Sequence, residues 1–125
     1  MESRVQAGLS IMKMGIVRNI ASVAAVATAH GIGSKKVLLG NDETETRLAQ
    51  IAVTKLSKGE QSEIHVHPTM EECFLIVEGE VSVQVESQQL QLHKGDFIQV
   101  MAGQPHGIKA LTDAAILTIG CATTD

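Results

Sequence analysis

Short runs rich in Val, Ile, Leu and Thr recur after Gly40, and glycine-containing turns separate them. Apolar runs of strand length bounded by turn residues are typical of antiparallel β structure, and no long helical repeat interrupts them. The runs predicted to be strands are Arg47–Leu56, Glu63–His67, Glu72–Glu78, Glu80–Glu86, Gln89–His93, Asp96–Val100, His106–Ala110 and Ala115–Cys121. Glycine accepts a positive φ at no steric cost, so turns such as Glu78-Gly79 suit tight hairpins. The pattern predicts an all-β barrel or sandwich.

The first 40 residues differ from the rest in composition and periodicity. Small residues dominate there and their periodicity is weak, so Asn19–Thr28 is compatible with a short helix or with a strand and a turn. Lys35–Leu39 is predicted to be a short strand. We expect residues 1–40 to form an N-terminal arm and residues 41–125 to form the barrel.

Composition narrows the class of protein. A chain of 125 residues suits one domain, and a hydrophobic content of 44% permits a packed core. The net charge of −4 does not favour a nucleic-acid partner. The apolar run Ile20–Ala29 is shorter than a membrane-spanning helix, and Cys73 and Cys121 form no disulfide framework or CxxC motif. We expect a cytoplasmic protein with reduced thiols and no membrane or nucleic-acid partner.

Three histidines and a glutamate are the candidate metal ligands. His65 and His67 lie two residues apart in a predicted strand, so both side chains point to one face. Glu72 begins the next run, and a carboxylate facing a barrel interior is costly unless a charge compensates it. His106 follows a Gly-Gln-Pro turn that can return it to the same site. Imidazole nitrogens and a carboxylate oxygen suit one divalent ion such as Zn, Mn, Fe or Ni.

A lone His-x-His pair is weak support for a metal site, so the glutamate and the later histidine carry the argument. Glu71 is an alternative ligand, but Glu72 shares the parity of the apolar positions that follow it. His30 is interpreted as a loop residue and His93 as a solvated residue before a turn. Neither is expected to bind the metal.

These residues resemble the two motifs of the cupin superfamily. Gly59-x5-His65-x-His67-x4-Glu72-x6-Gly79 is similar to the first motif, and Gly95-x5-Met101-x-Gly103-x2-His106 is similar to the second. The chain departs from the second motif at Met101, where the family usually has Pro, and at Ala110, where it usually has Asn. The resemblance implies a small double-stranded β-helix, a jelly-roll-like barrel that commonly forms homodimers. It also implies that the N-terminal arm, residues 1–40, packs on the barrel or at the dimer interface, and the alternative is that this segment frays.

The resemblance does not fix an activity, because cupins include oxygenases, decarboxylases, isomerases and proteins that only bind ligands. The chain has no Tyr and no Trp, which lowers the odds of a nucleotide-sugar enzyme with a tyrosine acid or of a sugar-stacking site. One hypothesis is a metal-dependent enzyme acting on a small oxygen-chelating molecule. The alternative is a non-catalytic module that binds or senses a small molecule, and a barrel that has lost its metal is a third.

Overall fold

The computed structural model describes residues 15–123 and contains nine strands and two short 3₁₀ turns within that range. The 3₁₀ turns are η1 (Ile20–Ser22) and η2 (Asn41–Glu43). The strands are β1 (Val26–Ala27), β2 (Ser34–Gly40), β3 (Leu48–Leu56), β4 (Met70–Glu78), β5 (Glu80–Val85), β6 (Gln88–His93), β7 (Phe97–Val100), β8 (His106–Ala110) and β9 (Ala114–Ala122).

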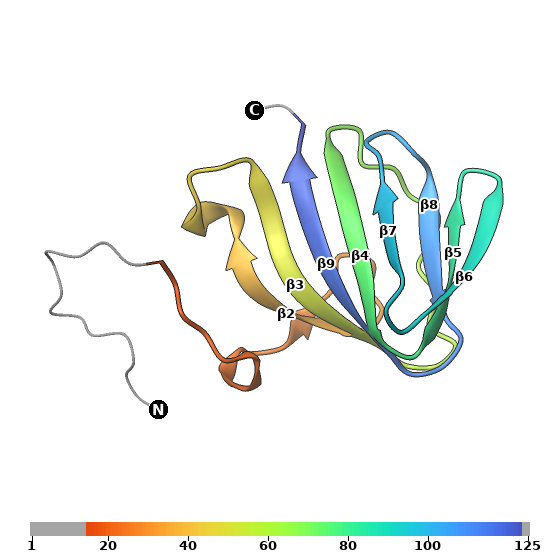
Figure 1. The fold of residues 1–125 in the computed structure, drawn as a ribbon, viewed down its shortest axis with the longest axis horizontal. Helices are drawn as coiled ribbons and strands as arrows, with labels where there is room; N and C mark the ends of the chain where they lie inside the picture. The colour runs from red at the N-terminus through yellow and green to blue at the C-terminus, as the bar shows by residue number, and fades with distance from the viewer. Residues whose placement is uncertain (1–14, 124–125) are drawn as a thin grey trace, which may run out of the picture.

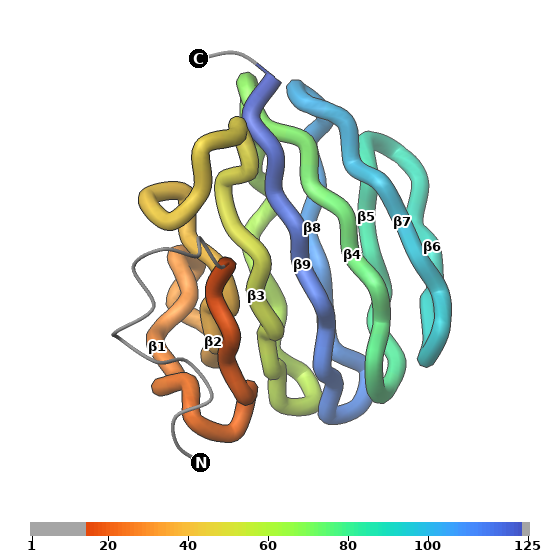
Figure 2. Tube along the Cα trace, turned by 60° about the vertical axis from the view of Figure 1, so that its left-hand side comes forward, coloured from red at the N-terminus to blue at the C-terminus, as the bar shows by residue number. Residues whose placement is uncertain are grey.

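The strands form two sheets with antiparallel pairing throughout. The larger sheet has the order β1-β2-β3-β9-β4-β7, and the smaller has the order β6-β5-β8. The large sheet spreads across Figure 1, and in Figure 2 β8 and β5 pass behind β9 and β4. The expected all-β fold is therefore confirmed.

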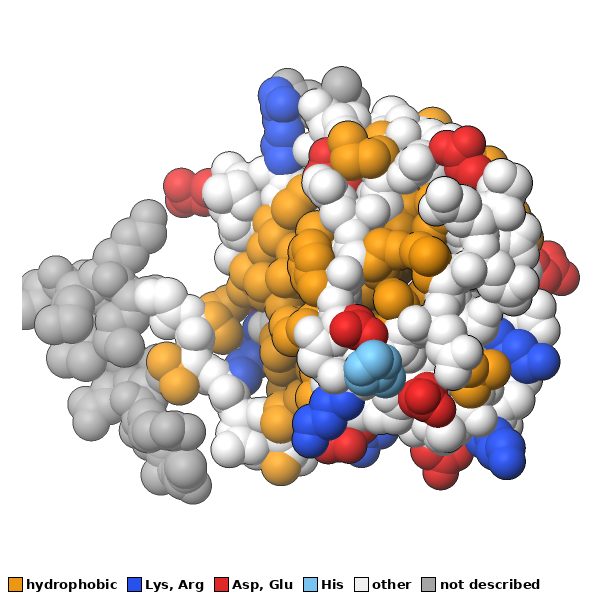
Figure 3. Space-filling view, turned by 45° about the vertical axis from the view of Figure 1, so that its right-hand side comes forward, with side chains coloured by type: hydrophobic (Ala, Val, Ile, Leu, Met, Phe, Trp, Pro, Cys, Tyr) orange, Lys and Arg blue, Asp and Glu red, His pale blue; other side chains and the backbone are white. Residues whose placement is uncertain are grey.

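The core lies between the sheets. Its largest fully buried side chains come from both sheets and are Ile76, Ile116, Val81, Val83 and Val100. Strand alternation places every second residue inward, as the burial of Val81 and Val83 in β5 shows. Figure 3 views the molecule with the right-hand side of Figure 1 turned forward. Hydrophobic side chains occupy the middle of this face, and charged side chains lie mostly around them.

The predicted strand Glu63–His67 does not form as a continuous strand. The only bridge within this segment is the isolated one between His65 and His106, and just before the segment Gln61 makes another isolated bridge to Lys109 of β8. The backbone N–H of Ile108 donates to the hydroxyl of Ser62 at 3.0 Å, so a side chain replaces the carbonyl that a regular ladder would use. The ladder is broken there, but His65 and His106 still exchange both backbone hydrogen bonds, at 2.9 and 3.0 Å.

The N-terminal segment joins the large sheet. β2 pairs with β3 along its length, with a register shift between Val37 and Leu39. Ahead of it, Arg18 donates to the backbone oxygen of Leu38 at 2.7 Å and to Glu43 at 2.9 Å. Residues 15–40 of the expected arm thus contact the barrel, and residues 1–14 lie outside the described residues.

The Asn19–Thr28 segment folds as a turn followed by a short strand. The side-chain oxygen of Asn19 accepts from the N–H of Ala21 at 2.8 Å, which caps η1, and β1 follows. Within residues 15–123, no helix is long and apolar enough to cross a membrane.

Candidate metal centre

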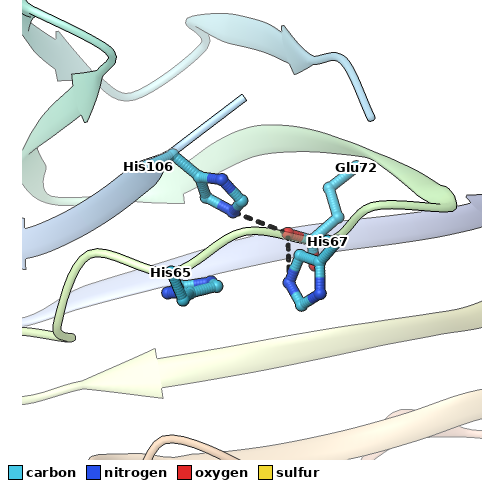
Figure 4. A group of neighbouring side chains, drawn as sticks. All are labelled: His65, His67, Glu72 and His106. Atoms are coloured by element: carbon cyan, nitrogen blue, oxygen red, sulfur yellow. Dashed lines mark hydrogen bonds and ion pairs between the residues drawn. The ribbon is translucent and has the colours of Figure 1, made fainter. Parts of the chain in front are cut away.

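Four side chains converge at one end of the cavity between the sheets. His65 and His67 come from the segment before β4, Glu72 from β4 and His106 from the start of β8. Each offers one ligand atom, and these atoms all lie within 4.8 Å of one another (Figure 4). The structure therefore brings together the four residues that the sequence singled out.

His106 and Glu72 form the buried side of the cluster. The Nε2 atom of His106 lies 3.1 Å from Oε1 of Glu72, and the histidine residue is 4% exposed. Burial lowers the pKa of His106, but its hydrogen bonds with Glu72 and with the Gln104 carbonyl outweigh burial and leave the pKa raised. Burial raises the pKa of Glu72, but the hydrogen bond from His106 and the other imidazoles leave that pKa lowered. The glutamate is thus ionised and able to bind a cation.

Backbone hydrogen bonds orient two of the imidazoles. Nδ1 of His65 donates to the carbonyl oxygen of Glu63 at 2.8 Å, and Nδ1 of His106 donates to that of Gln104 at 2.9 Å. A proton held on Nδ1 leaves Nε2 of a neutral imidazole with its lone pair available. In His106 the hydrogen bond to Glu72 places a second proton on Nε2, which a metal ion would displace. A backbone carbonyl that accepts the Nδ1 proton is a usual partner of a metal-ligating histidine.

His67 supplies the observation that tests the site most directly. Its Nε2 atom is buried and has no hydrogen-bond partner, although Oε1 of Glu72 lies 3.3 Å away, outside hydrogen-bonding geometry. Burial, the main cause, lowers the pKa of His67 and favours the neutral ring. A buried nitrogen with an unused lone pair is costly unless something binds it. A divalent cation would satisfy it, so the donor set fits a metal ion of the predicted kind.

The remaining candidates lie apart from the cluster or beside it. Glu71 accepts a hydrogen bond from Gln99 at 2.9 Å and is not one of the converging groups. His93 is exposed and lies 3.2 Å from the carboxylate of Asp96, as expected for a solvated residue. His30 is a loop residue, but its ring centroid lies only 4.0 Å from that of His65.

The position of His30 was missed by sequence reasoning. The loop that follows β1 carries it over the cluster, and burial followed by the neighbouring His65 lowers its pKa. Gly31 and Gly33, with φ of 75° and 64°, shape this loop. Because His30 lies next to a glycine in a weakly periodic segment, the sequence gives no sign of its contact with His65, which is more than 30 residues away.

The cluster opens into a cavity of about 240 Å³. Most of its surface is apolar, with Phe74 and Ile116 among the lining residues, and the polar lining residues beyond the cluster include Lys35 and Gln50. A small, mostly apolar cavity with a few converging polar groups is the usual form of a small-molecule site.

Comparisons with known proteins agree with this architecture. Residues 52–120 match the sequence profile of the Cupin domain family. The quercetin 2,3-dioxygenase of Bacillus subtilis (strain 168) is 25% identical over 72 residues, which are 58% of this chain and 21% of that protein. The chain thus spans about a fifth of the length of this curated relative.

Solved structures show the same fold at low sequence identity. A predicted oxalate decarboxylase from Thermotoga maritima has a TM-score of 0.77 and 19% identity, with 86% of this chain and 99% of that chain covered. Ectoine synthase from P. lautus has a TM-score of 0.74 and 14% identity, with 85% and 77% covered. The family match covers more than half of the sequence and both motifs, and so this chain belongs to the cupin family.

Proposed function

We propose that the protein binds one divalent metal ion through His65, His67, Glu72 and His106 and uses it on a small oxygen-chelating organic molecule. The convergence of three imidazoles and one carboxylate at the end of a cavity carries this proposal. A bound ion would act as a Lewis acid that polarises an oxygen atom of the ligand. Four protein ligands leave open positions on an ion of higher coordination number, as a reactive site requires.

The chain's own residues would prepare the site in three ways. The Glu63 and Gln104 carbonyls hold the rings of His65 and His106 in orientation. Glu72 contributes the negative charge that offsets the cation. Apolar lining residues such as Phe74 and Ile116 keep the surroundings poor in water, which strengthens each electrostatic contact with a ligand.

The comparisons support metal chemistry only in outline. The curated relative is named a dioxygenase, and one similar structure is described as a predicted oxalate decarboxylase. The cavity beyond the cluster offers His30 and Lys35 as its titratable groups. Because few acid or base groups surround the cluster, we assign the central role in any reaction to the metal centre itself.

Metal analysis followed by a turnover screen tests this proposal. Purified protein should be loaded separately with Fe, Mn or Ni, and bound metal should be quantified by elemental analysis. Each form is then assayed with small hydroxy acids, keto acids and diketones for substrate loss and for oxygen uptake. We expect bound metal and metal-dependent turnover of at least one compound.

Two results would contradict parts of the proposal. Absence of bound metal after loading with every ion would contradict the metal centre. Tight metal binding with no turnover across the panel would contradict the enzymatic role and favour the module that binds or senses a small molecule.

A further inference from the structure

A lysine and a glutamine form a polar pair in the cavity, apart from the metal cluster. Lys35 of β2 and Gln50 of β3 both line the cavity and are half-buried. The ammonium of Lys35 donates to Oε1 of Gln50 at 2.9 Å. Among the cavity-lining residues in the described range, Lys35 is the only lysine or arginine.

In this pair the groups left for a ligand are mainly hydrogen-bond donors. An ammonium group has no acceptor, so the amide oxygen of Gln50 must face Lys35. The amide nitrogen of Gln50 then keeps its two N–H donors, and Lys35 keeps its remaining N–H groups. Within residues 15–123, no carboxylate lies at ion-pair distance from Lys35. A ligand that meets both groups must therefore accept hydrogen bonds, and a negative charge suits it best.

Sheet register relates the pair to the metal centre. Gln50 lies opposite Gly120 of β9, and Gly120 lies opposite Glu72 of β4. Residues directly opposite each other in antiparallel strands share a face, so Gln50 and Glu72 point into the same cavity. Gly120 between them has no side chain, and a Cβ there would approach the sulfur of Met70 to 3.0 Å. No side chain of β9 separates Gln50 from Glu72 in this row, but the thioether of Met70 from β4 packs over Gly120, so a ligand that spans the two residues would lie against Met70.

We propose that Lys35 and Gln50 form an anion subsite for one carboxylate of a small dicarboxylic acid. This inference rests on the proposed function, because the other end of the acid would reach the metal centre. Coulomb attraction to Lys35 and hydrogen bonds from both side chains would fix the distal carboxylate. The cavity of about 240 Å³ restricts the ligand to a small molecule. The substrate class is thus narrowed from oxygen-chelating molecules in general to short acids with a second negative group.

Calorimetric titration of the manganese-loaded protein tests the subsite. The probes are malonate, succinate and glutarate, each compared with its monoamide, which keeps the shape and loses one charge. We expect at least one diacid to bind about tenfold or more tightly than its monoamide, as a charge-assisted contact provides. Lys35→Met should reduce this preference to about twofold or less, whereas Lys35→Arg should keep most of it.

Lys36→Met is the matched control. Lys36 is the next residue of β2, and strand alternation points its side chain away from Lys35, where its ammonium donates to the Ile20 carbonyl at 3.1 Å. This variant should keep the wild-type preference. A Lys35→Met protein that retains the preference, or a wild type that prefers no diacid over its monoamide, would overturn the subsite.

Metal content, measured on every variant, separates the two proposals. If the variants retain metal but the preference for the diacid does not depend on Lys35, the subsite is overturned and the metal centre stands. Failure of the wild type to hold metal would contradict the proposed function instead. In that case the titrations would be repeated on the metal-free protein, where the charge of Lys35 should still favour the diacid. Equal binding of the diacid and its monoamide there would overturn the subsite as well.

Discussion

Hydrogen bonds from Nδ1 to backbone carbonyls fix the orientation of the imidazoles of His65 and His106. Such bonds keep a proton on Nδ1 and direct Nε2 toward the cluster, so the rings need little reorientation to bind a cation, which would displace the Nε2 proton that His106 shares with Glu72. Nε2 of His67 is already buried without a partner. The cluster therefore carries an unmet bonding requirement that a divalent ion would fulfil.

Removing two ligands should abolish metal retention. The double substitution His65→Ala and His106→Ala deletes two of the three imidazoles, and we expect metal affinity to fall by more than about 100-fold. Elemental analysis after dialysis measures the effect. His93→Ala is the control, because that exposed histidine pairs with Asp96 outside the cluster and its loss should leave metal content unchanged. Equal metal in the double variant and the wild type would show that the ligands lie elsewhere.

Tight turns hold the elements in register, and the turn between β4 and β5 is the most crowded of them. Gly79 has a φ of 83°, and a Cβ there would collide with the carbonyl oxygen of Asp113 and approach Cα of Ala114 to 2.9 Å. Gly95, between β6 and β7, has a similar φ of 92° but has open space around it. Comparing substitutions at the two glycines therefore distinguishes the cost of backbone strain from the cost of a steric collision.

Alanine at these two positions should destabilise the fold unequally. Gly95→Ala adds only the strain of a left-handed residue, about 1 kcal/mol. Gly79→Ala adds that strain and a collision with the backbone that leads into β9, so we expect a loss of at least about 3 kcal/mol. Urea unfolding of both variants measures the difference. Similar losses in the two variants would contradict the packing described at Gly79.

Local pattern predicted most elements, because strand alternation and glycine turns are local signals. It failed for Glu63–His67, where the hydroxyl of Ser62 accepts the hydrogen bond that a continuous ladder would give to a carbonyl. The ligand set followed from motif spacing, and strand parity favoured Glu72 over Glu71. The contact of His30 with His65 and that of Lys35 with Gln50 depend on how distant segments cross the cavity, which no local signal encodes.

Across the whole molecule, the four candidate ligands join elements of both sheets. They come from β4 of the large sheet, β8 of the small sheet and the connection between β3 and β4. An ion that binds only the folded protein stabilises it by mass action, by about 2.7 kcal/mol at a free concentration 100 times the Kd. For a domain of this size that corresponds to a rise in Tm of roughly 10 °C.

The stabilisation by metal should increase with pH. The pKa of His106 is raised above its ordinary 6.5, so in the metal-free protein its pairing with Glu72 stabilises the fold below pH 6.5 and is lost as pH rises through the raised value. Protons compete with the metal for the same nitrogen, so metal binds better as pH rises. Calorimetric scans with Zn and with a chelator, from pH 5 to about 8, should show a growing difference in Tm. A difference that shrinks with rising pH would contradict this linkage.

The central claim is that His65, His67, Glu72 and His106 hold one divalent ion. An anomalous difference map from crystals of the manganese- or zinc-loaded protein tests it most directly. The account predicts a single strong peak within bonding distance of the three imidazoles and the carboxylate, about 2.0–2.2 Å for zinc. A fully loaded crystal with no peak among these four side chains, or with its only peak elsewhere, would contradict it.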